Sequence, residues 1–197
     1  MDTVTQQTWI VLAIVVIVAL IALTAWLLYS KRQSHRLEQR FGPEYARAVD
    51  EMGSRTKAES ELKTREKRVE KLNIVPLTPP EAARFDQAWK ALQASFIDNP
   101  KGVVAQADQL VRELLLKRGY PMGDFERRAA DISVDHPAVV DNYRAAQAIA
   151  ARDLRGETNT EDLRKAVVHY RALFDELLEV SEPTREAMPA RRIEVHS

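Results

Sequence analysis

Cysteine is absent from this chain of 197 residues. Its absence excludes disulfide bonds, zinc sites built on thiolates and a cysteine nucleophile, and it fits a reducing compartment. The chain also lacks several short motifs that accompany common chemistry: a metalloprotease helix pair, a phosphate-binding loop, a dinucleotide fingerprint and a nucleophile elbow. No stretch shows the pattern of a β-strand. We therefore expect an all-α protein, and we predict no cofactor and no metal.

An excess of charge of one sign is missing too, since 29 Lys and Arg balance 29 Asp and Glu. From residue 76 onward, 17 basic and 20 acidic side chains give a net charge of −3. Nucleic-acid binding usually needs a concentrated basic face, which this part of the chain does not offer. We therefore expect no nucleic-acid partner.

Charged side chains are absent from residues 9–29, which are mostly Val, Ile, Leu and Ala. A helix of this length rises about 30 Å, the thickness of the hydrocarbon core of a bilayer. Trp9 lies at one end and Trp26 with Tyr29 at the other, where amphipathic rings prefer the membrane interface. The pattern predicts a transmembrane helix over 9–29. A cleaved signal peptide is the alternative, but the preceding tail, residues 1–8, lacks Lys and Arg, and the run exceeds a usual signal core of about 7 to 15 residues.

Basic residues follow the apolar run at once, whereas Asp2 is the only charged residue before it. Positive charge tends to stay on the cytoplasmic side of a membrane. The sequence therefore predicts an N-terminus outside and a main domain in the cytoplasm, with the lipid bilayer as one partner. The residues expected at the membrane interface are Trp9, Trp26, Tyr29, Lys31 and Arg32.

Residues 30–75 are highly charged, and from position 31 they carry 12 basic and 8 acidic side chains. Sparse apolar positions predict a solvated, charged juxtamembrane helical spacer, supported by ion pairs four residues apart such as Glu61 with Arg65. A coiled-coil seam through Leu62 and Val69 is an alternative, weakened because Arg65 would occupy an intervening core position. The basic excess also attracts anionic lipid, which leaves a lipid-sensing role open.

A proline-rich segment from Ile74 to Pro80 separates this spacer from a new domain. Thr78 and Glu81 form a predicted capping box with proline in the first helical turn. Four long amphipathic helices with short connections follow, and they predict an antiparallel helical bundle over 76–180. Residues 181–197 have no apolar periodicity and are predicted to form a disordered tail.

Only a few polar residues gather where chemistry could take place. Asp135 and His136 lie in one predicted loop, and His169 lies on the last helix. Asp135 also reads as a cap of the following helix, and His169 lies on the flank of an apolar stripe. Asp131 is expected to pair with a neighbouring arginine at the surface.

Several short runs are distinctive: RGYP at 118–121, FE at 125–126, SVDHP at 133–137 and HYR at 169–171. Together they resemble a family of uncharacterised bacterial membrane-anchored proteins, over residues 36–179. That family has no established activity, so the resemblance transfers no catalytic residue. It implies a bacterial inner membrane, and it marks a candidate interaction loop with Arg118, Tyr120, Asp135 and His136.

These observations predict a single-pass protein of the inner (plasma) membrane whose cytoplasmic helical bundle binds a protein partner or serves as a scaffold, without catalysis. Two alternatives stay open. One is a membrane-anchored enzyme that uses Asp135, His136 and His169. The other is a sensor of anionic lipid that acts through the basic juxtamembrane helix.

Overall fold

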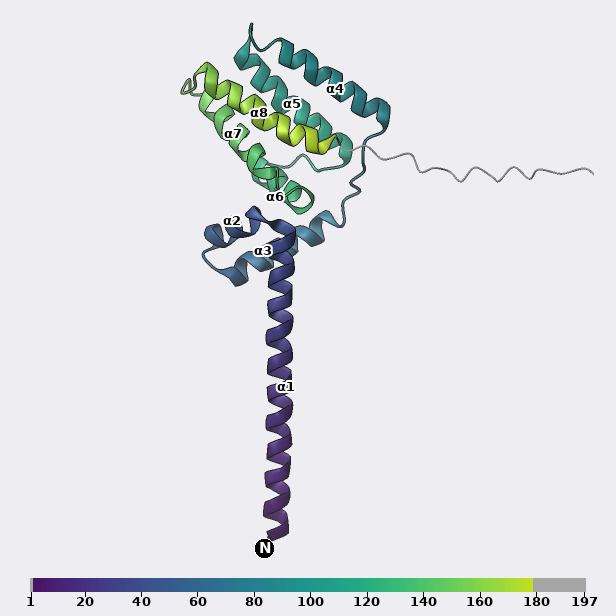
Figure 1. Cartoon of the computed structure of the whole chain (residues 1–197), viewed down its shortest axis with the longest axis vertical. Coiled ribbons are helices and arrows are strands. Elements are labelled where there is room, and N and C mark those ends of the chain that lie inside the picture. The colour runs from purple at the N-terminus through teal and green to yellow at the C-terminus, as the bar shows by residue number, and fades with distance from the viewer. Residues whose placement is uncertain (1, 179–197) are drawn as a thin grey trace, which may run out of the picture. The chain divides into compact units, whose positions relative to one another are not determined.

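The computed structural model describes residues 2–178, except for the side chains of residues 2–8 and 10–15. The predicted disordered tail, 181–197, lies outside the described residues. Within the described part the chain forms eight helices and no strand, which confirms the all-α class (Figure 1). The helices are α1 (Asp2–Phe41), α2 (Pro43–Met52), α3 (Arg55–Val69), α4 (Pro79–Ala94), α5 (Pro100–Arg118), α6 (Phe125–Asp135), α7 (Val140–Asp153) and α8 (Thr160–Leu177).

These helices belong to two compact units. Unit 1 comprises residues 1–71 and 124–141, and unit 2 comprises residues 72–123 and 142–197. Unit 1 therefore contains α1, α2, α3 and α6, whereas unit 2 contains α4, α5, α8 and most of α7. The domain boundaries expected at residues 30, 76 and 181 stay predictions.

Helix α1 continues without a break from the apolar run into the basic segment. Side chains from Val16 to Ser30 are all exposed. Thr24, a polar residue within this run, donates its hydroxyl to the carbonyl oxygens of Leu20 and Ile21, at 2.9 Å each. Such bonds satisfy the hydroxyl within its own helix. Of the helices described, α1 is the one long and apolar enough to cross a membrane.

The core of unit 1 forms where the last turns of α1 meet α2, α3 and α6. Gly42, with φ of 48°, makes the turn after α1, and Pro43 begins α2. The sequence predicts a solvated spacer here, but the structure buries a continuous apolar set. A thin apolar stripe is enough for burial because four helices share one small core. Its buried members are Leu37, Phe41, Tyr45, Ala48, Ala58, Leu62, Val69, Ala129 and Ile132.

Arg65 is buried within this unit rather than at a coiled-coil seam. Its Nη1 lies 2.8 Å from Glu44 Oε1 on α2, and its Nε lies 3.2 Å from Glu61 Oε1. The predicted Glu61–Arg65 pair is therefore present. Because a buried arginine needs a partner, the pair with Glu44 explains how this charge enters the core.

Unit 2 has its own aromatic core, between α4, α5, α7 and α8. Trp89 of α4 packs on Phe174 of α8 with ring centroids 4.6 Å apart, and Tyr143 of α7 meets Tyr170 of α8 edge to face at 6.4 Å. All four rings are buried. Helix α5 lies beside both α4 and α8.

Local capping interactions start these helices, and the one at α4 is the capping box that the sequence predicts. The capping box of Thr78 and Glu81 opens α4. The Asn99 side chain accepts a hydrogen bond from the Gly102 N–H at the start of α5, and the Asp124 side chain accepts one from Arg127 at the start of α6. These caps fix the residues at which α4, α5 and α6 begin.

Candidate functional site

The four residues of the predicted interaction loop fall into two units. Arg118 and Tyr120 belong to unit 2, whereas Asp135 and His136 belong to unit 1. Arg118 ends α5, where its Nη1 donates to the Leu177 carbonyl oxygen at 3.3 Å. Tyr120 is buried. Both side chains therefore pack and stabilise unit 2 itself.

The turn that joins Arg118 to Tyr120 is tightly packed on the preceding connection. Gly119 has a φ of 97°, and a Cβ at this position would lie 2.3 Å from the Asn73 carbonyl oxygen. The Val75 N–H donates to the Arg118 carbonyl oxygen at 2.9 Å. Only glycine fits such a close approach in this backbone conformation.

Asp135 ends α6 instead of capping the next helix, which begins four residues after His136 at Val140. The Oδ1 atom of Asp135 lies 3.9 Å from Nη2 of Arg40. His136 is buried, and its N–H donates to the Ile132 carbonyl oxygen at 2.8 Å. The expectation that Asp135 caps the following helix is wrong because the chain makes a separate turn before α7 starts.

His169 belongs to unit 2, where its Nδ1 lies 2.8 Å from Asn142 Oδ1. The three residues of the enzyme alternative are thus shared between the two units. Across the described residues, no group of three or more His, Asp or Glu side chains is placed to hold a metal ion. The enzyme alternative stays a prediction without a constellation to support it.

The burial and the partner of Asp131 both differ from the expected surface ion pair. It is completely buried, and its Oδ1 accepts from Arg68 Nε at 2.7 Å and lies 2.6 Å from Nη2. A surface pair with Arg127 or Arg128 was expected from proximity along α6. The pairing with α3 wins because α6 is covered by α3, and a buried carboxylate needs a charged partner.

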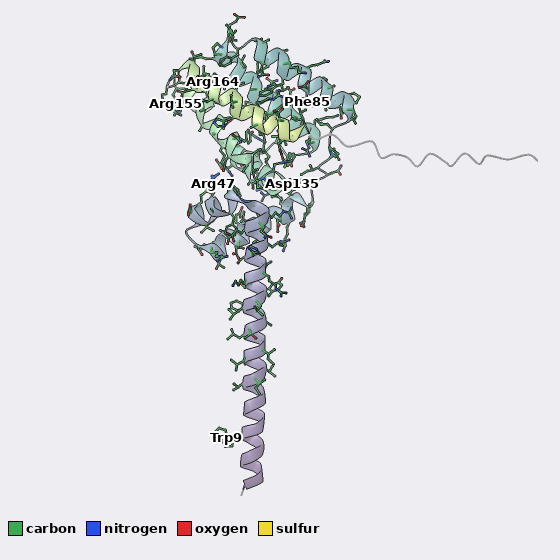
Figure 2. The ribbon with its side chains drawn as sticks, in the orientation of Figure 1. Trp9, Arg47, Phe85, Asp135, Arg155 and Arg164 are labelled. Carbon is green, nitrogen blue, oxygen red and sulfur yellow. The ribbon has the colours of Figure 1, made fainter. Side chains whose placement is uncertain are left out.

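The predicted interface residues all lie on α1 with exposed side chains. Trp9 projects from the lower part of this helix in Figure 2. Trp26 and Tyr29 end the apolar run, and Lys31 and Arg32 follow directly. One helix therefore presents an apolar belt with aromatic ends and then a cationic ring, the arrangement that suits a bilayer and its headgroups.

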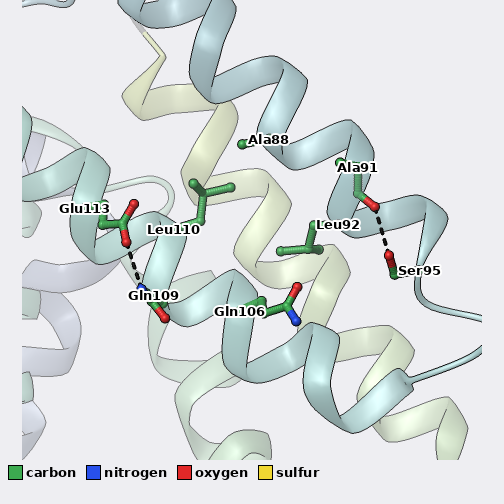
Figure 3. Close-up of a pocket in the computed structure, with 8 residues that line it drawn as sticks. All are labelled: Ala88, Ala91, Leu92, Ser95, Gln106, Gln109, Leu110 and Glu113. Carbon is green, nitrogen blue, oxygen red and sulfur yellow. Dashed lines mark hydrogen bonds between the residues drawn. The ribbon is translucent and has the colours of Figure 1, made fainter.

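Unit 2 carries a groove between α4 and α5 that the sequence does not reveal. Figure 3 shows Ala88, Ala91 and Leu92 of α4 facing Gln106 and Leu110 of α5 across it. The hollow encloses about 420 Å³, and the remaining lining residues are Ser95, Gln109 and Glu113. Small side chains on α4 and amides on α5 thus form its two walls. We call it the α4–α5 groove.

The groove continues toward the start of α4. A second hollow of about 370 Å³ shares Glu113 and is lined also by Arg84, Phe85, Leu116 and Lys117. From Arg84 to Ser95 the combined groove follows α4 for roughly 16 Å, or three helical turns. Leu116 is exposed at this end. The α4–α5 groove therefore combines small, apolar and polar positions along a length that matches a short helix.

One ion pair braces this end of the groove. Lys117 Nζ of α5 lies 2.7 Å from Glu81 Oε1 of α4. The Lys117 ammonium and the hydrogen bonds from the Thr78 N–H and hydroxyl lower the pKa of Glu81 to about 2. The carboxylate is therefore ionised at neutral pH and joins the first turn of α4 to the last turn of α5.

No family model, curated protein or solved structure matches this chain. The resemblance to uncharacterised anchored proteins therefore stays a prediction. Function has to be argued from the geometry of α1 and of the α4–α5 groove.

One feature of the sequence corresponds to the groove. Ala88, Ala91 and Ser95 are small residues at helical spacing, beside the buried Trp89 and Leu92. Such a stripe is ordinary in a solvated helix face, so it predicts nothing by itself. Its meaning depends on the pairing of α4 with α5, which periodicity does not supply.

Proposed function

We propose that this protein is a single-pass, membrane-anchored adaptor. Helix α1 holds it in a bacterial inner membrane with units 1 and 2 in the cytoplasm, and the α4–α5 groove binds an amphipathic helix of a protein partner. The observation that supports this proposal is the groove itself, which follows α4 for about three turns beside α5.

Support for the anchor comes from burial. A core helix of a water-soluble protein hides its apolar side chains, but in α1 the large apolar residues from Val16 to Leu28 are all at least half exposed. Leaving such a belt in water is costly, at about 25 cal/mol per Å² of apolar surface. The basic residues Lys31 and Arg32 support the cytoplasmic orientation.

Support for the partner comes from the chemistry of the groove walls. Ala88 and Ala91 let another helix approach closely, and Leu110 and Leu116 offer apolar contact. Gln106 faces the groove as a polar side chain at its edge. An amphipathic helix lays its apolar face into such a groove and pairs polar groups at the rim.

A photo-crosslinking residue at Ala91 tests the groove directly, in the full-length protein in its membrane. Its matched control is the same residue at Gln93, which is exposed on α4 but does not line the groove. We expect one discrete protein adduct from position 91, mapping to a helical segment of the partner, and none from position 93. Ala88→Trp should fill the slot and abolish the adduct. Equal adducts from both positions, or none from position 91, would overturn the proposal.

A further inference from the structure

Unit 1 contains a second hollow, at the place where the apolar part of α1 ends. It encloses about 510 Å³ and lies between α1 and the first residue of α3. The α1 residues that line it are the adjacent pair Lys31 and Arg32, with Leu28, His35 and Glu38 one turn away or further along, so they share one side of the helix. Its lining residues are Leu28, Lys31, Arg32, His35, Glu38 and Arg55.

The charge of this hollow is positive. Lys31, Arg32 and Arg55 contribute three cations, and Glu38 is the single acidic residue of the lining. Lys31 and Arg32 make no ion pair or side-chain hydrogen bond with the described residues. By contrast, Arg36 and Arg40, only a turn or two further along α1, both pair with Glu66 of α3. Two cations nearest the apolar belt are thus available for an external anion.

Arg55 is held in place by its own unit. Its Nε donates to Tyr45 Oη at 2.9 Å and to Glu59 Oε1 at 3.0 Å. The same Glu59 oxygen accepts from the Ser34 hydroxyl of α1 at 2.6 Å. The side chain of Arg55 is 61% exposed. Its two Nη groups therefore remain for another acceptor, on an arginine whose position relative to α1 is defined.

The position and length of the hollow along α1 match those expected of the headgroup layer of a bilayer. Leu28 belongs to the apolar belt, and His35 lies seven residues beyond it, which is about 10 Å along the helix axis. Each headgroup layer is about 5 to 8 Å thick. An acyl chain could run beside Leu28 while the phosphate of the same lipid lies between the cations.

We propose that this hollow, lined by Lys31, Arg32 and Arg55 above Leu28, binds the headgroup of one anionic glycerophospholipid. The phosphodiester accepts hydrogen bonds from the two arginines, as such groups commonly do. A zwitterionic lipid carries a cationic amine as well, which the same three side chains repel. Because Arg55 begins α3, an occupied site joins unit 1 to the membrane surface at a second point. The inference rests on the proposed membrane span.

Quenching of a tryptophan at position 28 by brominated lipids tests this site in the reconstituted full-length chain. Leu28→Trp places this reporter on the lining of the hollow, and Trp9→Phe with Trp26→Phe removes the two natural tryptophans of the span. The remaining Trp89 is buried in unit 2 and gives a constant signal. Brominated phosphatidylglycerol and brominated phosphatidylcholine are compared at the same low mole fraction. We expect stronger quenching by phosphatidylglycerol.

Substitutions separate a defined site from general attraction. Near an anionic surface each cation contributes roughly a fivefold preference, so Arg55→Gln should reduce the selectivity for phosphatidylglycerol about fivefold. Lys67→Gln is the control, since it removes the same charge from the exposed far end of α3. It should leave the selectivity unchanged.

Each result has a definite reading. Equal quenching by both lipids, or an equal loss of selectivity in the two variants, would overturn the headgroup site while leaving the span intact. Absence of quenching by either lipid would show that position 28 is outside the bilayer, and would overturn the proposed span along with this inference. The two failures are therefore distinguishable.

Discussion

Arg68 and Asp131 are 63 positions apart in the sequence, yet the Arg68 Nε lies 2.7 Å from the Asp131 carboxylate. The pair joins α3, which follows α1 and α2, to α6, which lies beyond α4 and α5 in the chain. Leu62 of α3 and Ile132 of α6 are also fully buried, so these two packed helices contribute both apolar and charged side chains to the core of unit 1. Unit 1 is therefore completed by α6, which follows α4 and α5 of unit 2 in the sequence.

Asp131→Asn should destabilise unit 1. It removes a charged acceptor from a completely buried position, and hydrogen bonds to charged groups contribute about 1.5 to 3 kcal/mol. Hydrogen exchange at the amides of α3 and α6 reports the free energy of local opening. Asp175→Asn is the control, because Asp175 pairs with Arg171 at the surface, and its loss should cost less than about 1 kcal/mol. Equal effects would contradict a structural role for the Arg68–Asp131 pair.

Leu62→Ala separates a packed unit 1 from a solvated spacer. Leu62 is fully buried, so truncation should lower the free energy of unfolding by about 2 to 5 kcal/mol. Leu154→Ala makes the same chemical change at a site that is 90% exposed, and it should alter stability by less than about 0.5 kcal/mol. Thermal unfolding of the full chain in detergent measures both. A loss below 1 kcal/mol at Leu62 would favour the solvated spacer.

Glu81 should make the stability of unit 2 depend on acid pH. Its pKa is lowered from 4.5 to about 2 by Lys117 and by Thr78, so the folded state favours the ionised carboxylate. This stabilisation is complete above pH 4.5 and is lost as the pH falls toward 2. The thermal midpoint of the parent protein should therefore exceed that of Glu81→Gln at neutral pH, and the gap should close on acidification.

Lys117→Gln provides the check on the cause. In the Lys117→Gln background, the difference in thermal midpoint between Glu81 and Glu81→Gln should be smaller at neutral pH. The reason is that the ammonium group makes the largest contribution to the lowered pKa of Glu81. A gap that is independent of pH between 5 and 2.5 would contradict the ion-pair explanation. A gap unaffected by Lys117→Gln would assign the effect to the Thr78 cap alone.

The topology of the anchor is tested with a protease added to spheroplasts. A C-terminal tag on the main domain should survive until the membrane is permeabilised, since Lys31 and Arg32 favour the proposed cytoplasmic location of the following residues. Alkaline carbonate should leave the protein in the membrane fraction. Digestion of the tag in sealed spheroplasts would show that the main domain lies outside the cytoplasm, opposite to the proposed orientation. Release by carbonate, with residues 1–29 missing from the product, would identify a cleaved signal peptide instead.

Features that depend on neighbouring residues were predictable from sequence. The start of α4 at Thr78 and Pro79 and the turn at Gly119 follow from side chains within a few positions of each other. The all-α class follows from helical periodicity along the whole bundle. These signals are local, so tertiary structure has little opportunity to override them.

Features that depend on pairing between distant helices were not predictable. Ala58 and Leu62 lie on a sparse stripe, which looks solvated until α6 is known to cover it. Asp131 has two arginines as neighbours along its own helix, and only the fold brings it to Arg68. The α4–α5 groove was missed for the same reason: Ala88 and Ala91 become a wall only when α5 lies opposite them.

The unbroken course of α1 has a mechanical consequence. Leu37 and Phe41, which anchor the core of unit 1, lie on the same rigid rod as Val16 and Leu28. A helix of this kind does not bend freely, because every residue added extends one hydrogen-bonded ladder. In the proposed membrane span, a thinner bilayer favours a more tilted α1, and unit 1 tilts with it because both belong to one continuous helix. The thickness of the bilayer would thereby set the orientation of unit 1 relative to the proposed membrane surface.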